Sequence, residues 1–459
     1  MLKKALIISL IPLFGFALTL TEAKHLMGRT SFTLTKADYA ILKSKSKKEA
    51  VAWLLKQNQD SDTLPPPSWG SRPKIRIKPP RKMNTQEREA FRKEYKQRRE
   101  TLKNWWMQIL LQTKTPLREK MTLFWHNHFT SSLKKVRSSY LMLEQNKLLR
   151  KYALGNFGDF LHAISKDPAM ILYLDNQSNK KQNPNENYAR EVLELFTLGE
   201  GHYSEKDITE SARAYTGWHV NRKKMRFVFV KKLHDYEKKT FLAKRCDFDG
   251  DDILDIILQQ QRTAQYITTK FYREFINDRE INQIEIERIA KLFYESHYDI
   301  STLLKEILLS PDFWDEKNRA VLVKSPIELI VGTLRSLGMQ PSQIRPLVSA
   351  SRQLKQDLFA PPNVKGWAGG VDWLDSSSVL MRRQIIGRLS RGKEMGKMKN
   401  KMMQVRENIF SKEKLSKKQK VAFLREYLLP ITPINTVNEK KDIKKITVDL
   451  IKDPVYQLK

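Results

Sequence analysis

Residues 183–218 read NPNENYAREVLELFTLGEGHYSEKDITESARAYTGW, and this stretch carries the densest helix signals in the chain. Apolar side chains recur every three or four positions between residues 185 and 198, which predicts a helix. Gly199 follows, and glycine readily adopts the left-handed conformation found at helix ends. Ser204 and Asp207 have the spacing of a capping box, which predicts the start of a second helix. The stretch therefore predicts two helices joined by a tight turn.

A polar edge lies beside the apolar face of the first predicted helix. Glu191 and Glu194 are three residues apart, so they are neighbours on a helix, and His202 follows in the turn. One interpretation is a solvated edge held by ion pairs through Arg190, which are common on helix surfaces. The other is a site in which Glu191, Glu194 and His202 bind a divalent metal ion or a substrate. Both interpretations are open from the sequence.

Four further residues are candidate ligands for such a metal ion. His126 and His128 lie in a predicted helix, about 200° apart around its axis, so they share one ion only if the helix ends between them. Each histidine alone is more typical of a satisfied core or surface position. His234 and Asp235 are adjacent in a predicted hairpin. A metal ion held among these groups would activate water for hydrolysis.

A second candidate cation site precedes the first helix. Asp175, Asn179 and Glu186 stand at about positions 1, 5 and 12 of a polar loop, which is the ligand spacing of a calcium-binding EF-hand. Lys180 occupies the position where that loop needs glycine for its sharp turn, so a true EF-hand is not expected. A looser calcium site remains as one alternative. The other is an Asn-rich loop whose side chains satisfy the backbone of its own turns.

The first 23 residues have the pattern of a signal peptide. Lys3 and Lys4 precede an apolar segment that is too short to span a membrane, and cleavage is predicted after Ala23. Cys246 is the only cysteine, which excludes an intramolecular disulfide. A secreted or periplasmic protein is therefore expected, and the absence of disulfides in so long a chain favours the bacterial periplasm.

The rest of the chain is mostly helical in pattern. The predicted fold is all-α, with one short β-hairpin near residues 226–242. One large helical domain is expected over residues 24–392, and a Pro-rich loop at 61–83 lies within it. Residues 393–459 are Lys-rich with sparse apolar positions, which predicts a basic tail of loose helices or disordered chain.

The chain is strongly basic, with a formal net charge of +33 from 84 Lys and Arg against 51 Asp and Glu. This excess predicts affinity for an anionic polymer of the cell envelope, unless the charge is spread over solvated faces. No nucleic-acid motif is present, so specific nucleic-acid binding is not expected. No GxSxG, HExxH or P-loop motif is present either. The stiff loop at 361–367 and Trp373 have two interpretations, stacking on sugar rings or plugging the core.

Several long segments resemble a known bacterial family, DUF1800, a domain of unknown function. They are REKMTLFWHNHFTSS (118–132), DPAMILYLDNQSN (167–179), PNENYAREVLELFTLGEGHYSE (184–205), ARAYTGW (212–218), LVKSPIELIVGTLRSLG (322–338) and LFAPPNVKGWAGG (358–370). The resemblance covers about residues 25–390. It implies an exported, mainly α-helical protein and a frequent genomic neighbour, the sulfatase-like DUF1501 family, which is a candidate partner. It implies no reaction, cofactor or catalytic residue.

Two classes of function are compatible with these observations. The first is a periplasmic binding or accessory protein that partners a sulfatase-like DUF1501 protein and touches an anionic envelope polymer. The second is a metal-dependent hydrolase acting on an envelope or anionic polymer, with its metal among the Glu, His and Asp side chains named above. A calcium ion in the 175–186 loop would instead be structural. The sequence leaves open whether the protein is an enzyme.

Overall fold

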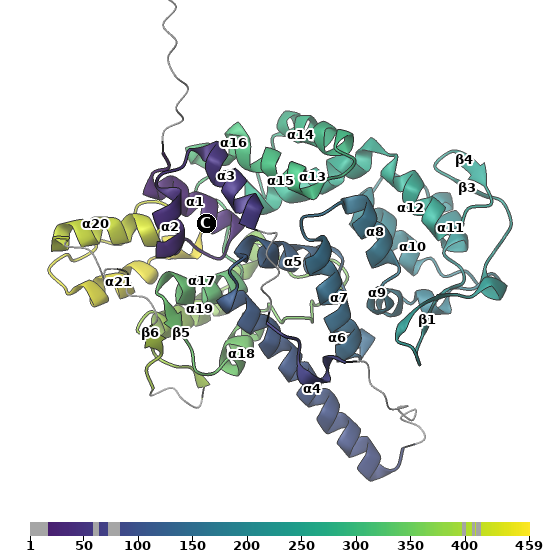
Figure 1. Cartoon of the computed structure of the whole chain (residues 1–459), viewed down its shortest axis with the longest axis horizontal. Helices are drawn as coiled ribbons and strands as arrows, with labels where there is room; N and C mark the ends of the chain where they lie inside the picture. Colours follow the sequence, from purple (N-terminus) through teal and green to yellow (C-terminus); the bar gives the residue numbers. More distant parts are fainter. Residues whose placement is uncertain (1–16, 58–63, 72–82, 397–400, 406–408, 410–414) are drawn as a thin grey trace, which may run out of the picture.

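The computed structural model describes residues 17–57, 64–71, 83–396, 401–405, 409 and 415–459, and these residues form a single, mainly helical domain (Figure 1). The helices of its first half are α1 (Leu20–Thr30), α2 (Lys36–Leu42), α3 (Lys47–Lys56), α4 (Thr85–Gln112), α5 (Pro116–His128), α6 (Leu133–Val136), α7 (Ser139–Tyr152), α8 (Phe157–Ser165), α9 (Pro168–Tyr173), α10 (Asn187–Glu191) and α11 (Glu205–Ala214). The helices of its second half are α12 (Gly250–Leu258), α13 (Gln261–Phe275), α14 (Gln283–Glu295), α15 (Ile300–Leu309), α16 (Pro311–Trp314), α17 (Pro326–Ser336), α18 (Arg345–Gln353), α19 (Ser376–Leu389), α20 (Lys417–Leu428) and α21 (Ile443–Ile451).

The stretch 183–218 forms the predicted helix pair, with one irregularity. After α10 the chain continues as a π-helical segment, Val192–Thr197, and Gly199 then adopts a positive φ of 82°. Ser204 and Asp207 form the predicted capping box at the start of α11. A π-helical turn inside a helix frequently accompanies a functional site, because it reorients backbone carbonyls. Here the carbonyls of this segment accept hydrogen bonds from α5 and α13.

Helix α5 runs through the middle of the molecule and organises the core (Figure 1). Its Trp125 is fully buried and contacts Phe129, Phe160 and Phe271, which come from three different parts of the chain. A large aromatic side chain contributes about 1.5–3 kcal/mol when it is fully buried. This packing fixes α5 against α8 and α13, and thereby fixes the polar side chains that α5 carries on its other face.

The predicted hairpin near 226–242 is replaced by two separate hairpins. β1 (Trp218–Asn221) pairs with β2 (Arg226–Phe229), and β3 (Lys239–Phe241) pairs with β4 (Lys244–Cys246). Both predicted strand segments exist, but each pairs with its nearer neighbour, since a short connection costs less conformational entropy. A third pair joins β5 (Met339–Gln340) to β6 (Gln404–Val405).

The described parts of residues 393–459 are integrated into the domain rather than forming a loose tail. Helix α20 packs against α1 and α21, and the apolar side chains Leu424, Tyr427 and Leu450 lie in the main hydrophobic core. The last residue, Lys459, is buried and pairs its backbone with Leu322. The apolar stripe of this region is hard to recognise in the sequence, because many lysines lie on the solvated faces of the same helices.

The predicted cleavage point after Ala23 lies inside α1. Thr19 and Glu22 form the capping box of this helix, and Ala23 is fully buried. A cut after Ala23 would remove the first turn of the helix together with its cap, whereas an earlier cut would preserve both. The apolar segment before residue 17 and most of the Pro-rich loop at 61–83 lie outside the described residues. In the described part of the chain, no helix is both long and apolar enough to cross a membrane.

Candidate functional site

The polar side chains of residues 183–218 do not converge on one point. Glu191 and Glu194 are close enough to interact, and burial together with the Glu194 charge raises the pKa of Glu191. Glu194 accepts a hydrogen bond from the hydroxyl of Tyr203. His202 is exposed in the turn, and partial burial and Arg262 lower its pKa. The sequence predicts that Arg190 pairs with Glu186 and Glu194; the structure confirms the Glu186 pair and adds one with Glu205, so this edge is largely an ion-paired surface.

The two histidines of α5 are buried in separate surroundings. His126 lies among Trp106, Phe359 and Trp367, and neither of its ring nitrogens has a hydrogen-bond partner in the described residues. His128 contacts the backbone carbonyl of Phe196 through Nε2 at 3.1 Å. Burial lowers the pKa of both histidines to about 3, so both are neutral. The helix continues through both residues, and they face different neighbours as their spacing predicts.

His234 and Asp235 hold the connection between the two hairpins. His234 Nδ1 lies 2.8 Å from the carbonyl oxygen of Thr216. Asp235 binds Arg213 at 2.7 Å, and although burial raises its pKa, Arg213 brings the net pKa below the ordinary value. Over the described ranges, no three His, Cys, Asp or Glu side chains are placed to hold one metal ion. The predicted set of Glu191, Glu194, His202, His126, His128, His234 and Asp235 is therefore not brought together.

The polar side chains of the predicted calcium loop have hydrogen-bond and ion-pair partners within the protein. Asp175 pairs with Lys135 at 2.6 Å, which occupies one of its carboxylate oxygens. The buried Asn179 side chain donates to the carbonyl of Ala212 and accepts from the amide of Asn185. Glu186 bonds Arg190 and Thr209. These oxygens point to different partners, which is the arrangement of the Asn-rich, self-satisfied loop.

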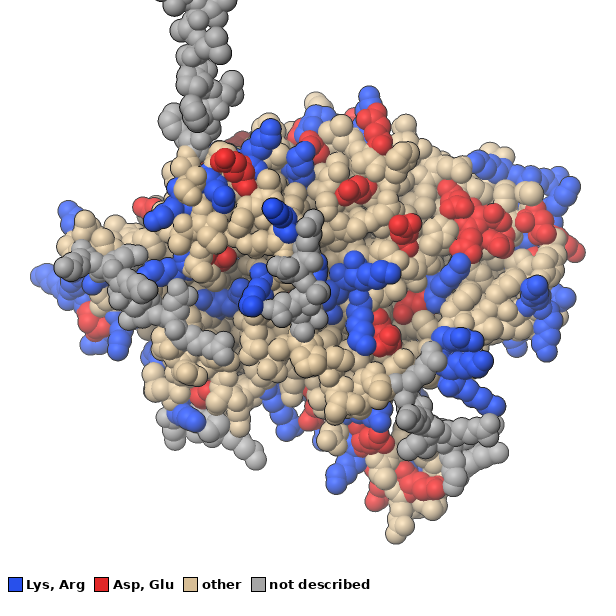
Figure 2. All heavy atoms as spheres, viewed as in Figure 1, with Lys and Arg blue, Asp and Glu red and all other residues tan. Residues whose placement is uncertain are grey.

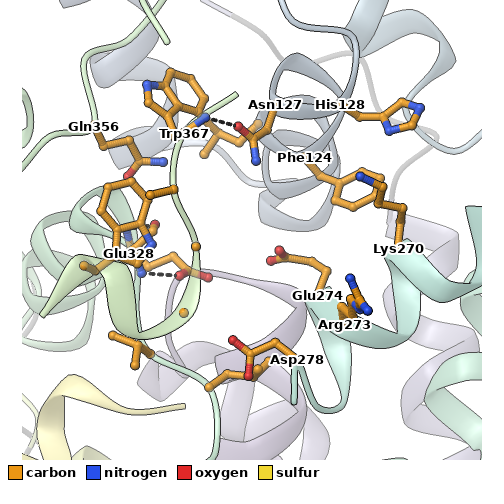
Figure 3. Close-up of a pocket in the computed structure, with 18 of the residues that line it drawn as sticks. Phe124, Asn127, His128, Lys270, Arg273, Glu274, Asp278, Glu328, Gln356 and Trp367 are labelled. Carbon is orange, nitrogen blue, oxygen red and sulfur yellow. Dashed lines mark hydrogen bonds between the residues drawn. The ribbon is translucent and has the colours of Figure 1, made fainter. Parts of the chain in front are cut away.

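A pocket beside α5 brings together residues from widely separated parts of the chain (Figure 3). Its cavity is about 360 Å³, at the lower end of the range for small-ligand sites. α5, α13 and the start of α17 form its sides, and the loop around Trp367 covers one edge. Three of the segments that carry the family resemblance, 118–132, 322–338 and 358–370, thus meet at this cavity.

Two glycines allow the covering loop to approach the rest of the pocket. Gly366 has a φ of 90°, and a Cβ atom there would lie 2.3 Å from Asn127 Oδ1. This close approach lets the amide of Trp367 donate to Asn127 Oδ1 at 2.6 Å, a bond drawn in Figure 3. Gly370 has a φ of 55°, and its Cβ would lie 2.3 Å from an Asp278 oxygen. Larger residues at either position would push the loop away.

One end of the pocket is a set of paired charges, which we call the ionic floor: Lys120, Glu274, Glu328 and Lys459. Glu328 binds Lys120 closely and Lys459 at 2.5 Å, and it also accepts from the amide of Ser325. Glu274 lies 3.2 Å from Lys120 and 3.5 Å from Lys459. Burial opposes ionisation of Glu328, but Lys120 and Lys459 outweigh it and lower its pKa. Burial likewise opposes the Lys120 charge, and Glu328 and Glu274 outweigh it and raise that pKa.

Three further cations line the cavity, and we call them the basic wall: Lys270, which lies across the cavity from Glu328 in Figure 3, Arg273, which lies beside Glu274, and Lys365 of the loop around Trp367. Lys270 and Arg273 are neighbours on α13, and no salt bridge joins any of the three to an Asp or Glu among the described residues. Lys270 is half-buried, and burial followed by the nearby Arg273 charge lowers its pKa. Its ammonium lies 5.1 Å from the centre of the Tyr266 ring. A partly desolvated ammonium without a carboxylate is costly, and an anion in the pocket would offset that cost.

Aromatic and hydrogen-bonding groups complete the lining. Trp367 and Trp373 are 5% and 4% exposed, so they are mostly built into the core while still lining the cavity. Phe124 lies beside Lys270 in Figure 3, on the side of the cavity facing Glu274. The two interpretations of the tryptophan loop are therefore not exclusive. The loop plugs the core and also forms one edge of a polar pocket.

The sequence predicted the helix start and the loop that border this pocket but not its charged side chains. The spacing of Ser325 and Glu328, with Pro326 between them, predicts a helix start there, and Trp367 ends the stiff loop at 361–367. Lys270 was not selected, because a lysine on a helix has no local signal that separates a cavity-lining position from a solvated one. In the structure Glu274 forms a salt bridge with Lys120, a residue from α5. A contact between distant segments has no local sequence signal.

The comparisons with known proteins place the chain in one group and give no activity. A family model described as "Protein of unknown function (DUF1800)" matches residues 25–458. The match extends past residue 392, where the sequence reading ended the helical domain, and agrees with the packing of α20 and α21. No curated protein and no solved structure gives a significant match.

Proposed function

Because this chain belongs to the DUF1800 family, we propose a function from its own pocket: it binds an acidic group of an envelope polymer between the basic wall and the aromatic edge. The observation that carries this proposal is the Lys270 side chain, which is half-buried, lines the cavity and has no carboxylate partner among the described residues. Arg273 and Lys365 line the same cavity, so one anionic group could be met by several cations.

The pocket supports the proposal better than the overall charge does. Figure 2 shows Lys and Arg scattered over the visible face rather than gathered in one basic patch, and acidic residues cluster at one side, over α11 and α12. Scattered surface charge is screened over about 8 Å at physiological salt. A desolvated cation inside a pocket is screened much less, so specific recognition would depend on the basic wall.

Binding can be measured by calorimetry with oligogalacturonate as the acidic probe and a neutral dextran oligosaccharide of equal length as its control. We expect binding of the acidic probe only, and a loss of about tenfold or more in affinity for Lys270→Met, which removes one charge-assisted contact. Lys291→Met is the matched control. It removes one exposed lysine from α14, and we expect little change. Equal binding of both probes, or unchanged affinity in Lys270→Met, would contradict the proposal.

We further propose that the protein acts outside the cytoplasm beside a sulfatase-like DUF1501 partner. The supporting observations are the signal-peptide pattern at the N-terminus and the family membership. In this view the protein is a binding or accessory component that holds an acidic polymer for its partner. Co-purification from a periplasmic fraction checks both parts together. Recovery of the chain only from the cytoplasm, or without such a partner, would contradict them.

A further inference from the structure

The pocket is polar in two different ways at its two ends. The basic wall offers positive charge, whereas the far end presents the carboxylates of Glu274, Glu328 and Asp278. Figure 3 shows these three carboxylates pointing toward the space enclosed by Phe124, Trp367 and Gln356. A simple anion would use only the wall. The polar groups at the far end therefore indicate which chemical groups the rest of the ligand carries.

Asp278 differs from the other two carboxylates. Glu274 and Glu328 are neutralised by Lys120 and Lys459 in the ionic floor. Asp278 Oδ1 is buried and has no hydrogen-bond partner among the described residues. A buried carboxylate oxygen normally accepts a hydrogen bond, because leaving it unmade costs about 1–3 kcal/mol. Asp278 as a residue is only half-buried and lines the cavity, so its carboxylate borders space that a donor on the ligand can enter.

The surroundings of Asp278 determine the kind of donor. An ammonium group placed there would lie near Lys120 and Lys459, and also near Arg29, whose pKa responds to Glu328, Glu274 and Asp278. Arg29 is fully buried. Glu274 and Glu328 are already paired with Lys120 and Lys459, and Arg29 offsets the charge of Asp278, so a further positive charge would gain little net attraction for its desolvation, whereas a neutral hydroxyl would donate without that cost. Hydroxyl donors are therefore favoured at the far end.

Resting on the proposed function, we infer that the pocket takes an acidic sugar unit: its acidic group lies at the basic wall, and its ring hydroxyls donate to Asp278 at the opposite end. The cavity of about 360 Å³ is large enough for one or two sugar rings. Phe124 and Trp367 line the space between the two ends. Asp278 is thus a specificity residue, because it distinguishes a hydroxylated acid from an acid of the same size without hydroxyls.

The test compares two probes of similar shape on the unaltered chain. Glucuronate carries a carboxylate and ring hydroxyls, whereas cyclohexanecarboxylate carries the carboxylate on a bare ring. We expect calorimetry to show glucuronate binding about tenfold or more tighter. Equal affinities would overturn the sugar inference and leave the anion-binding proposal standing. Binding of neither probe would overturn both.

Variants give a second, independent readout. Asp278→Ala is expected to weaken glucuronate about tenfold and to leave cyclohexanecarboxylate unchanged, whereas Lys270→Met weakens both. Asp372→Ala is the matched control, since it removes an exposed carboxylate from the adjacent loop. A loss of both probes in Asp278→Ala would assign Asp278 a structural role and contradict its role in specificity. The probe comparison on the unaltered chain does not depend on whether any variant folds.

Discussion

The ionic floor and the basic wall line one pocket, and each contains a lysine removed from water: Lys120 is buried, and Lys270 is half-buried. Lys120 in the floor is met by Glu328 and Glu274, and its pKa lies above the ordinary value. Lys270 in the wall has no such partner in the described chain, and its pKa lies below the ordinary value. Burial lowers the pKa of both ammonium groups, so the difference comes from the carboxylates.

This difference separates a structural charge from one available to a ligand. The floor completes its own charge pairs, so removing one member leaves the others exposed to an apolar interior. In the wall, Lys270 has no carboxylate partner in the described chain. This lowers stability and, in the proposed function, raises affinity for an anion. Lys24 extends the comparison outside the pocket. It is buried and donates to Thr33 Oγ1 at 3.2 Å, and burial lowers its pKa to about 7.

The largest predicted effect is on the floor. Glu328→Gln keeps the shape of the side chain but leaves Lys120 and Lys459 without their shared carboxylate, and we expect the free energy of unfolding to fall by about 3–5 kcal/mol. Urea unfolding measures this change in the free energy of unfolding. Glu49→Gln is the control, because Glu49 holds the equivalent position of an exposed capping box in α3 and should change stability little. A loss as small as that of the control would mean that the floor is not a cooperative unit.

The second effect has the opposite sign and concerns the wall. In Lys270→Met we expect the free energy of unfolding at neutral pH to be unchanged or to rise by about 1 kcal/mol, because a desolvated charge is removed. The native pKa of Lys270 is lowered from 10.5, so the unfolded chain binds more protons between the two values. Stability of the unaltered protein therefore gains a rising contribution across that window, and the variant lacks it.

Urea unfolding at several pH values between 7 and 10 checks this prediction, with Lys291→Met as the control. A marked loss of stability in Lys270→Met at neutral pH would show that the ammonium is compensated within the protein. The wall and the floor would then be equivalent, and the comparison would fail. Retained stability with lost binding would instead separate folding from function at this residue.

The smallest effect is expected at a third, more exposed charge cluster. His162 on α8 contacts Asp251 at 3.0 Å and Asp255 at 2.9 Å on α12, and the Asp251 bond is the main cause of its raised pKa. Its stabilising contribution is therefore complete below about pH 6.5 and is lost as the pH rises through the raised value. We expect His162→Gln to cost less than about 1 kcal/mol at pH 5.5, because water screens the pair.

Thermal unfolding of His162→Gln at pH 5.5 and pH 9 tests this cluster, with the expected difference from the unaltered protein present only at the lower pH. A difference of equal size at both pH values would indicate packing rather than charge. A loss comparable with that of Glu328→Gln would show that exposure, by itself, does not determine the strength of these charge clusters.

Local sequence signals predicted the helices well and the site poorly. Helix starts such as Ser204 with Asp207 and Ser325 with Glu328 depend on neighbours three residues away, and the structure confirms both. Strand pairing and charge pairing depend on distant neighbours. Phe227 pairs with Val220 rather than with the segment at 240–242, and Glu274 pairs with Lys120 rather than with Lys270. The selected histidines had suitable chemistry, but their packing placed them apart.

The burial of Lys459 has a practical consequence for chemical labelling of the protein. Its side chain helps to close the ionic floor, its backbone pairs with Leu322, and only 8% of the residue is exposed. Reagents that acylate lysines are therefore expected to modify Lys459 far more slowly than an exposed lysine such as Lys291. The rate at which Lys459 is labelled would accordingly report how often this edge of the pocket opens.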